Sequence, residues 1–275
     1  MNIAFKIPPV SHQYSDMHLL AEAGKEEISF LIFSKSPFAL HGFYAFSFAR
    51  NIGPAEYADT IRHIIHKEHV LQQQFASCHI FYDGDETVLV PGQYFSEADK
   101  EKIAELMFGE NSATVCFHEN VKENGIKNVY RVPQKIHEAM TGAFPKSHFS
   151  HSSSSQLVKD GEEDTLRCVV FHNNIKIILF KAGKLQVVSY AEYVSPSDVC
   201  YHLLNTCEQF GVQPETVLLV LSGMVDERSN LYIEIYRYFL HVSFWGLPEG
   251  INIEHKLDEQ PHHFYSHLVS LAQCV

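Results

Sequence analysis

The chain has 275 residues, of which 45% are hydrophobic and 12% aromatic. That length suffices for two domains or one large domain, and the composition can fill their cores. Asp and Glu number 33 against 21 Lys and Arg, a formal net charge of −12. Such a balance argues against a general nucleic-acid-binding surface, because phosphates would be repelled.

The six cysteines form no C-x-x-C pair, and most lie within apolar runs. We therefore expect reduced thiols in a cytoplasmic protein, with Cys168, Cys200 and Cys207 buried. The N-terminal segment MNIAFKIPPVSHQ lacks the apolar stretch of a signal peptide. No window approaches the roughly 20 apolar residues of a membrane span, so we expect none.

The first quarter of the chain predicts strands and one helix. Residues 1–25 show little periodicity, and SDMHLLAEAG within them could be a short helical turn or a strand that docks on a neighbour. An apolar strand follows at 27–35, a turn at Ser36-Pro37, and a second long aromatic strand or strand pair at 38–49. Pro54 suits the first position of a helix that extends to about residue 73.

The next hundred residues alternate strands and helices. Asp83-Gly84-Asp85 between two apolar runs predicts a β-hairpin. Ser96 is expected to cap a helix that ends at Gly109. Further elements are expected as two strands, a helix, and a polar edge strand or loop, at 113–121, 128–133, 133–144 and 149–155.

The charged turn Lys159–Asp164 is the expected domain boundary, giving domains 1–160 and 161–275. Beyond it the pattern predicts three strands, a helix, a continuously apolar strand that is typical of burial on both faces, and a C-terminal amphipathic helix. These lie at 165–172, 175–184, 185–194, 195–210, 216–223 and 262–275.

The two halves can be aligned by pattern, although not by residue identity. The strand 27–35 corresponds to 165–173, the helix start at Pro54 to that at Pro196, and 77–84 to 216–223. The offset is roughly 140 positions at each landmark, which indicates an internal repeat. Two unrelated α/β halves are the alternative.

Three antiparallel strands, a helix and a buried strand form the order of a ribonuclease-H-like unit. Two such units in tandem, with EISFLIFSK and FYDGDETVLVP in one and VVFHNNIKIILF and VLLVLSG in the other, resemble the actin-like ATPase superfold. The chain most resembles a bacterial family of unknown function with that fold, and more distantly pilus-assembly and cell-division actin homologues. The resemblance implies an α/β fold of two tandem ribonuclease-H-like halves.

Active members of the superfold carry an Asp-x-Gly turn after the first strand of each half, where backbone amides and a Lys or Gln approach phosphate. On the alignment above, the first-half turn is Ser34-Lys35-Ser36-Pro37 and the second is His172-Asn173-Asn174. Neither contains Asp or Gly, although Lys35 could meet a phosphate. Ser222-Gly223 partly matches the superfold's adenosine-binding turn.

Other clusters offer weaker alternatives. His63, His66 and His69, with Glu68, could hold a metal, but a solvated helix face is the simpler interpretation. His263 and His267 form a second pair of this kind, for which we expect an interface or surface role. Asp83, Asp85 and Glu86 could hold Mg²⁺ or form a solvated hairpin tip. A metal-dependent nuclease is disfavoured, because neither expected first strand has an interior acid.

We therefore predict a degenerate actin-like ATPase that acts as a scaffold, binding another protein or holding a nucleotide such as ATP with Mg without hydrolysing it. An active ATPase or phosphotransferase with a divergent site is the alternative. Any ligand is expected in a cleft between the halves, at the carboxyl ends of strands. The candidate residues are Ser34, Lys35, Ser36, His172, Asn173, Asn174, Ser222 and Gly223.

Overall fold

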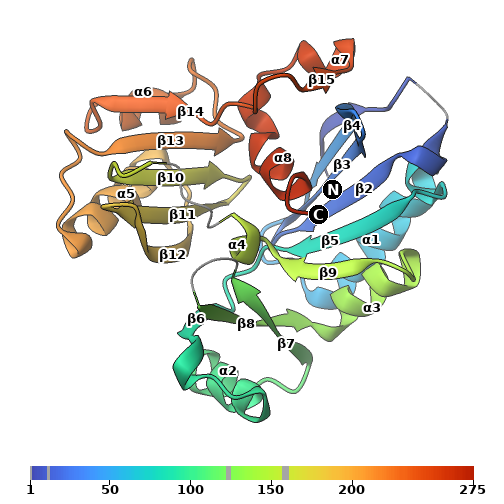
Figure 1. Ribbon diagram of the computed structural model, residues 1–275, viewed down its shortest axis with the longest axis horizontal. Helices are drawn as coiled ribbons and strands as arrows, with labels where there is room; N and C mark the ends of the chain where they lie inside the picture. The colour runs from blue at the N-terminus through green and yellow to red at the C-terminus, as the bar shows by residue number, and fades with distance from the viewer. Residues whose placement is uncertain (1, 11–12, 122–124, 157–160) are drawn as a thin grey trace. The chain divides into compact units, whose positions relative to one another are not determined.

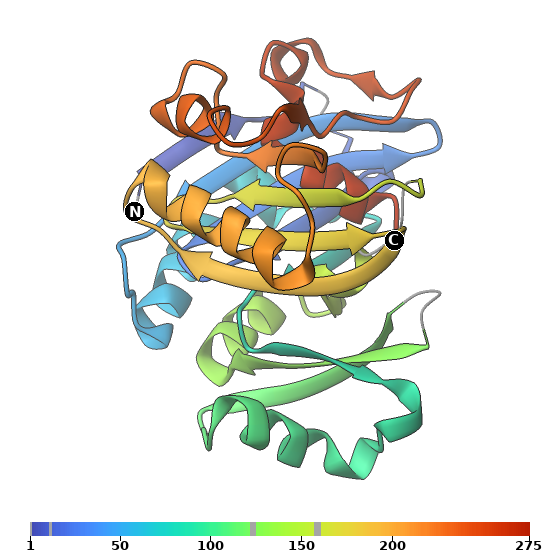
Figure 2. The ribbon, with the colours of Figure 1, turned by 90° about the vertical axis from the view of Figure 1, so that its left-hand side faces the viewer.

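A computed structural model describes residues 2–10, 13–121, 125–156 and 161–275 (Figures 1 and 2). The strands are β1 Asn2–Ile7, β2 His18–Ala23, β3 Glu27–Lys35, β4 Phe38–Ser47, β5 Ser77–Tyr82, β6 Thr87–Pro91, β7 Thr114–Val121, β8 Ile126–Pro133, β9 His148–His151, β10 Thr165–Val170, β11 Asn174–Lys181, β12 Lys184–Glu192, β13 Leu218–Gly223, β14 His241–Phe244 and β15 Asn252–Ile253.

The α-helices are α1 Pro54–Lys67, α2 Lys100–Phe108, α3 Gln134–Ala143, α4 Ser152–Ser155, α5 Pro196–Phe210, α6 Asn230–Ile235, α7 His255–Asp258 and α8 Ser266–Ala272. Short 3₁₀ helices are Tyr14–Asp16, His69–Gln72, Gly92–Tyr94, Glu97–Asp99 and His262–Phe264. Among the helices that the structure describes, none combines the length and apolar character needed to cross a bilayer.

The chain forms two compact units. The first comprises Met1–Gln156 with Gly250–Glu259 and Leu271–Val275, and the second comprises Leu157–Glu249 with Gln260–Ser270. The expected second domain, 161–275, thus differs from the observed unit, because two C-terminal segments belong to the first unit. The expected boundary at Lys159–Asp164 lies partly outside the described residues.

The first unit is built on a sheet of order β1-β4-β3-β2-β5-β9, with β15 beside β4. β2, β5 and β9 run parallel, and β3 is antiparallel to both β2 and β4. β4 is also antiparallel to β1 but parallel to β15. α1 and α3 pack on one face through Ile61, Ile64 and Met140. A smaller sheet, β6-β8-β7, carries α2.

The second unit has the sheet order β12-β11-β10-β13-β14. α5 lies across one face of this sheet, where Val199, Leu203 and Cys207 enter the core (Figure 2). The thiols of Cys168, Cys200 and Cys207 are buried and free, which confirms the expectation for these three residues. Burial raises the pKa of Cys168 to about 12, so this thiol stays protonated at neutral pH.

Both units contain the expected sequence of three antiparallel strands, a helix and a further strand, but the alignment of the first half was wrong by one strand. β2 pairs in parallel with β5 as β10 pairs with β13. The counterpart of β10 is therefore β2, and β3 corresponds to β11. The segment of β2 was left open between a short helical turn and a docking strand, because HLLAEA is short and residues 19–23 are all buried without alternation.

The hairpin expected at Asp83-Gly84-Asp85 is also wrong. β5 pairs with β2 and β9 in the large sheet, whereas β6 pairs with β8 in the small sheet. The segment around Asp83-Gly84 therefore connects the two sheets. The turn residues alone did not indicate this, because it depends on the pairing of β6 with β8.

Candidate functional site

A pocket of about 240 Å³ opens in the first unit at the carboxyl ends of the parallel strands β2, β5 and β9. Ala23, Tyr82 and His151, the last residues of these three strands, all line it. Such strand ends are the usual ligand-binding edge of an α/β sheet, because the strands end there and the connecting loops diverge. This pocket is our candidate functional site.

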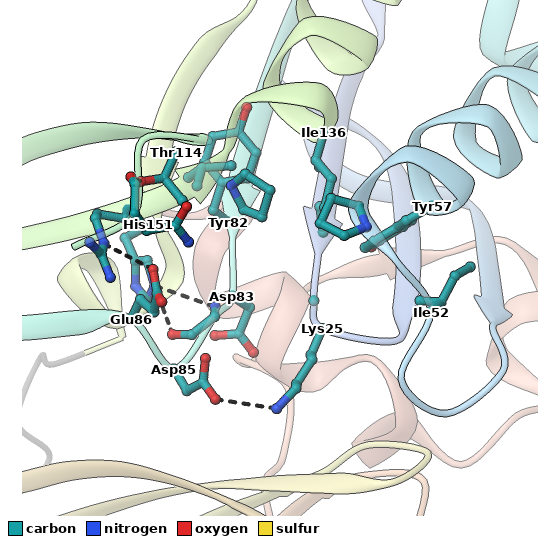
Figure 3. A pocket seen from close by; sticks show the side chains of 18 residues that line it. Lys25, Ile52, Tyr57, Tyr82, Asp83, Asp85, Glu86, Thr114, Ile136 and His151 are labelled. Carbon is teal, nitrogen blue, oxygen red and sulfur yellow. Dashed lines mark hydrogen bonds and ion pairs between the residues drawn. The ribbon is translucent and has the colours of Figure 1, made fainter. Parts of the chain in front are cut away.

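One wall of the pocket is apolar. Ile52 and Pro54 come from the start of α1, and Val132, Pro133 and Ile136 from the junction of β8 and α3. Figure 3 shows Ile52 and Tyr57 on one side of the pocket and Glu86 and His151 on the other. Burial raises the pKa of Tyr57 and of Tyr82, so both phenols are neutral and serve as amphipathic walls.

The acidic side chains of the pocket contact groups of the protein itself. The ammonium of Lys25 lies 3.4 Å from Asp85 Oδ2, and Arg131 Nε lies 3.0 Å from Glu86 Oε2 (Figure 3). The Arg131 side chain is only 4% exposed, so its charge is held within the wall. These pairs leave a pocket with charges of both signs.

Asp83 joins the large sheet to the turn after β9. Its side chain is buried and accepts a hydrogen bond from the hydroxyl of Ser152. His151 Nε2 lies 3.2 Å from the carbonyl oxygen of Gly84. Within the described residues, no group of three or more His, Cys, Asp or Glu side chains is arranged to hold a metal ion. The hydrogen bonds of Asp83 and His151 instead fasten the segment after β5 to the end of β9, on this side of the pocket.

The end of β2 and the turn after it carry Glu22-Ala23-Gly24-Lys25, of which Glu22 and Ala23 belong to the strand. Glu22-Ala23-Gly24 resembles the Asp-x-Gly pattern of the superfold, with Glu in place of Asp, and Lys25 follows it. The Gly24 amide donates a 2.9 Å hydrogen bond to Glu27 O, so it is already engaged. Gly24 and Lys25 both line the pocket, and they were not among the predicted site residues because β3 was taken as the first strand of this half.

The predicted residues Ser34, Lys35 and Ser36 lie at the opposite end of the sheet from this pocket. Phe33 pairs with His18 at the start of β2, whereas Ile28 pairs with Ala23 at its end. At about 3.3 Å per residue the separation is roughly 17 Å. These three residues were chosen on the incorrect strand alignment; a ligand role for them stays a prediction.

The second-unit candidates lie at the carboxyl ends of β10 and β13, as expected. Val170 pairs with Gly223, which brings the His172–Asn174 turn and Ser222-Gly223 to one edge. His172 is exposed, whereas Asn174 is buried within β11. The Ser222 hydroxyl is fully buried and lies 2.8 Å from His263 O and 3.1 Å from His267 Nδ1. Ser222 thus anchors the C-terminal segment.

Solved structures with the same fold exist at low identity. A protein of unknown function with an actin-like ATPase fold from Bacteroides thetaiotaomicron has a TM-score of 0.76 at 16% identity, covering 96% of this chain and 98% of that chain. The PilM–PilN type IV pilus biogenesis complex has a TM-score of 0.63 at 12% identity, covering 96% and 99%. The cytoplasmic domain of EpsL, from the type II secretion system of Vibrio cholerae, has a TM-score of 0.52 at 10% identity, covering 94% and 95%.

These similarities establish an α/β fold of the actin-like ATPase architecture, in agreement with the resemblance seen in the sequence. No curated protein matches the chain. Residues 11–242 match the family described as "Protein of unknown function (DUF3822)". Because this match spans most of the sequence, the chain belongs to the DUF3822 family.

Proposed function

We propose that this protein is a scaffold that binds a segment of a partner protein in the pocket at the ends of β2, β5 and β9. The observation that carries the proposal is the character of that pocket. Its wall is apolar and aromatic, with Ile52, Tyr57 and Ile136, and two of its carboxylates are paired with basic side chains. Such a surface suits a peptide with apolar side chains and polar ends.

The similar structures support this proposal only by analogy. PilM, in the complex named above, is held with PilN. At 12% identity this likeness shows the fold alone, and the pocket chemistry supplies the argument for this chain. We also propose that the protein resides in the cytoplasm, which the free, buried thiols of Cys168, Cys200 and Cys207 support.

A peptide library displayed on phage tests the proposal. Peptides selected on the full-length protein are expected to lose at least ~10-fold in affinity for Thr114→Trp, because Thr114 lines the pocket and an indole would fill it. Thr60→Trp is the matched control, on α1 and outside the pocket lining. Selected peptides that bind Thr114→Trp as tightly as the unaltered protein, or a library that yields no binder, would overturn the proposal.

A second function, nucleotide binding, is favoured by the Glu22-Ala23-Gly24-Lys25 turn. Because the Gly24 amide already donates to Glu27 O, phosphate contact would fall to the exposed side chain of Lys25. The corresponding second-unit turn, His172–Asn174, has no acid. The residues therefore fit the holding of a phosphate better than its hydrolysis, and an active ATPase or phosphotransferase is the less favoured alternative.

Calorimetric titration with Mg·ATP separates the two lysines. If the turn after β2 holds phosphate, Lys25→Ala weakens binding by about 10-fold, a typical loss for a charge-assisted contact, and Lys35→Ala has no effect. Weakening by Lys35→Ala alone would instead support the site first expected from the sequence. Absence of binding to the unaltered protein at millimolar Mg·ATP would eliminate this second function.

We further infer that the two units descend from one duplicated unit. Their central strands share one order, β4-β3-β2-β5-β9 and β12-β11-β10-β13-β14. Each unit also places its helix, α1 or α5, between the third antiparallel strand and the next parallel strand. An internal repeat requires this shared order of chain and sheet.

A further inference from the structure

Away from the pocket, three side chains from distant parts of the sequence form a continuous hydrogen-bonded row. Ser34 lies near the end of β3, His41 lies on β4, and Glu254 follows β15. His41 Nε2 is 3.1 Å from Ser34 Oγ, and His41 Nδ1 is 3.0 Å from Glu254 Oε1. The imidazole thus stands between a hydroxyl and a carboxylate, with one ring nitrogen directed to each.

The carboxylate is fixed from two further directions. The amide of Val10 donates a 2.9 Å hydrogen bond to Glu254 Oε2, the oxygen that does not face His41. The backbone of Glu254 donates to Leu40 O at 3.0 Å, next to the pairing of β15 with β4. The side chains of His41 and Glu254 are only 18% and 20% exposed. Little conformational freedom is left to the acid or to the ring it orients.

This arrangement fulfils the geometric criteria for an activated nucleophile. A hydroxyl and a base lie within hydrogen-bonding distance, and a third group orients the base. With Glu254 accepting from Nδ1–H, the lone pair of Nε2 faces Ser34. The Ser34 hydroxyl now donates to Pro37 O at 2.8 Å, and rotation about its Cβ–Oγ bond would direct the hydrogen to Nε2 instead.

We propose that Ser34, His41 and Glu254 form a hydrolytic site for small acyl esters. Ser34 Oγ forms a bond to the acyl carbon while its proton passes to His41 Nε2. The bond from that carbon to the alcohol oxygen breaks, and the alcohol leaves with the proton. Water then adds to the acyl-serine by the same route, which releases the carboxylic acid and restores Ser34. The overall balance is ester and water to acid and alcohol.

The substrate class follows from where Ser34 lies. The neighbouring turn residues Lys35, Ser36 and Pro37 are exposed, so an ester can approach the hydroxyl from solvent. Small acyl groups fit an open turn better than long chains, which require an apolar groove. The site is also distinct from the pocket, because Ser34 lies near the start of β2 and the pocket at its end.

A purely structural role is the rival explanation, in which the same row fastens the segment around Glu254 to β4. Reaction of the full-length protein with a fluorophosphonate, followed by mass spectrometry, distinguishes the two. The proposal predicts one adduct, on Ser34, and hydrolysis of p-nitrophenyl acetate above the buffer rate. No adduct on Ser34, or an adduct only on other residues, would overturn it.

Variants complete the test. Ser34→Ala is expected to abolish both the adduct and the ester hydrolysis. Glu254→Gln keeps the size of the side chain but reverses the tautomer of His41, so hydrolysis should fall at least ~100-fold. Ser96→Ala, an exposed serine without a side-chain cap bond, should retain full activity. Equal hydrolysis by Ser34→Ala and the unaltered protein contradicts the proposal, and adduct mapping on the unaltered protein decides the matter if a variant fails to fold.

Discussion

Gly223 closes the end of β13 against β10 in a way that no other residue can. Its φ is +83°, and a Cβ built there would lie 2.1 Å from the carbonyl oxygen of Val170. That oxygen accepts a 2.7 Å hydrogen bond from the Met224 amide. The glycine predicted for an adenosine-binding turn is therefore required by the packing of two strands, whatever binds nearby.

We predict that Gly223→Ala lowers the free energy of unfolding by about 3 kcal/mol, through backbone strain and the clash with Val170 O. Urea unfolding measures this. The matched control is Gly246→Ala in the same unit, where an added Cβ meets nothing within 4 Å. An equal and small effect of the two substitutions would show that the β10–β13 contact adjusts.

His79 is the residue with the clearest sensitivity to pH. Its Nε2 lies 3.0 Å from Ser77 Oγ, and its ring stacks on that of His148 at 5.2 Å. Desolvation, followed by the charges of Lys35, His148 and His18, lowers its pKa from 6.5 to about 4. Between these two values the unfolded chain binds more protons than the folded one, so stability is lost as the pH falls from 6.5 to 4.

We predict that the protein loses roughly 1–2 kcal/mol of stability between pH 7 and pH 4.5 through His79, after allowance for solvent screening of this half-buried ring. His79→Gln should remove that part of the pH dependence, and His63→Gln, on the exposed side of α1, should not. Denaturant unfolding at the two pH values is the measurement. An identical pH dependence of all three proteins would refute the assignment to His79.

At the scale of elements, α5 has the best-defined start in the chain. Ser195 Oγ accepts from the Asp198 amide, and Asp198 Oδ2 accepts from the Ser195 amide at 2.8 Å, which makes a capping box. Pro196 occupies the first helical turn. At the other end Gly211 is left-handed, with φ +62°.

We predict that Ser195→Ala destabilises the protein by about 1 kcal/mol, the usual value for loss of an N-cap hydroxyl. Glu208→Ala, at an exposed position of the same helix, is the control and should change stability by less than ~0.5 kcal/mol. Thermal unfolding of the two variants provides the comparison. Equal melting temperatures would mean that solvent replaces the cap without loss.

Elements with local signals were predictable. Pro54 begins α1, and Gly109 ends α2 as expected, because proline and glycine act within one helical turn. The cap of α2 was not: Ser96 precedes a 3₁₀ turn and Asp99 precedes α2, with no side-chain cap bond at either. The helix expected to reach residue 73 ends at Lys67 and continues as a 3₁₀ turn.

The C-terminal helix was likewise foreseen in outline. Residues 262–275 contain the 3₁₀ turn His262–Phe264 and α8, rather than one continuous helix. The polar stretch 149–155 was left open between edge strand and loop, and it contains most of the edge strand β9 and then α4. The residue pattern thus indicated the C-terminal helix and its amphipathic face, whereas it left the element at 149–155 open and did not predict α4.

In the molecule as a whole, the features that could not be predicted from the sequence depend on pairings between segments that are far apart in the chain. β15 pairs with β4 across more than 200 positions, which places part of the C-terminal region in the first unit. The candidate pocket was missed for the same reason. Gly24 and Lys25 follow β2, and only the parallel pairing of β2 with β5 identifies that strand as the first of the unit.

The chain keeps the actin-like ATPase fold, and we propose that it works by binding rather than by hydrolysing nucleotide. Release of phosphate from Mg·ATP by the purified full-length protein tests it most directly. We predict release no faster than in buffer, because the turn His172–Asn174 of the second unit contains no carboxylate. Sustained Mg-dependent turnover that Lys25→Ala abolishes would contradict it.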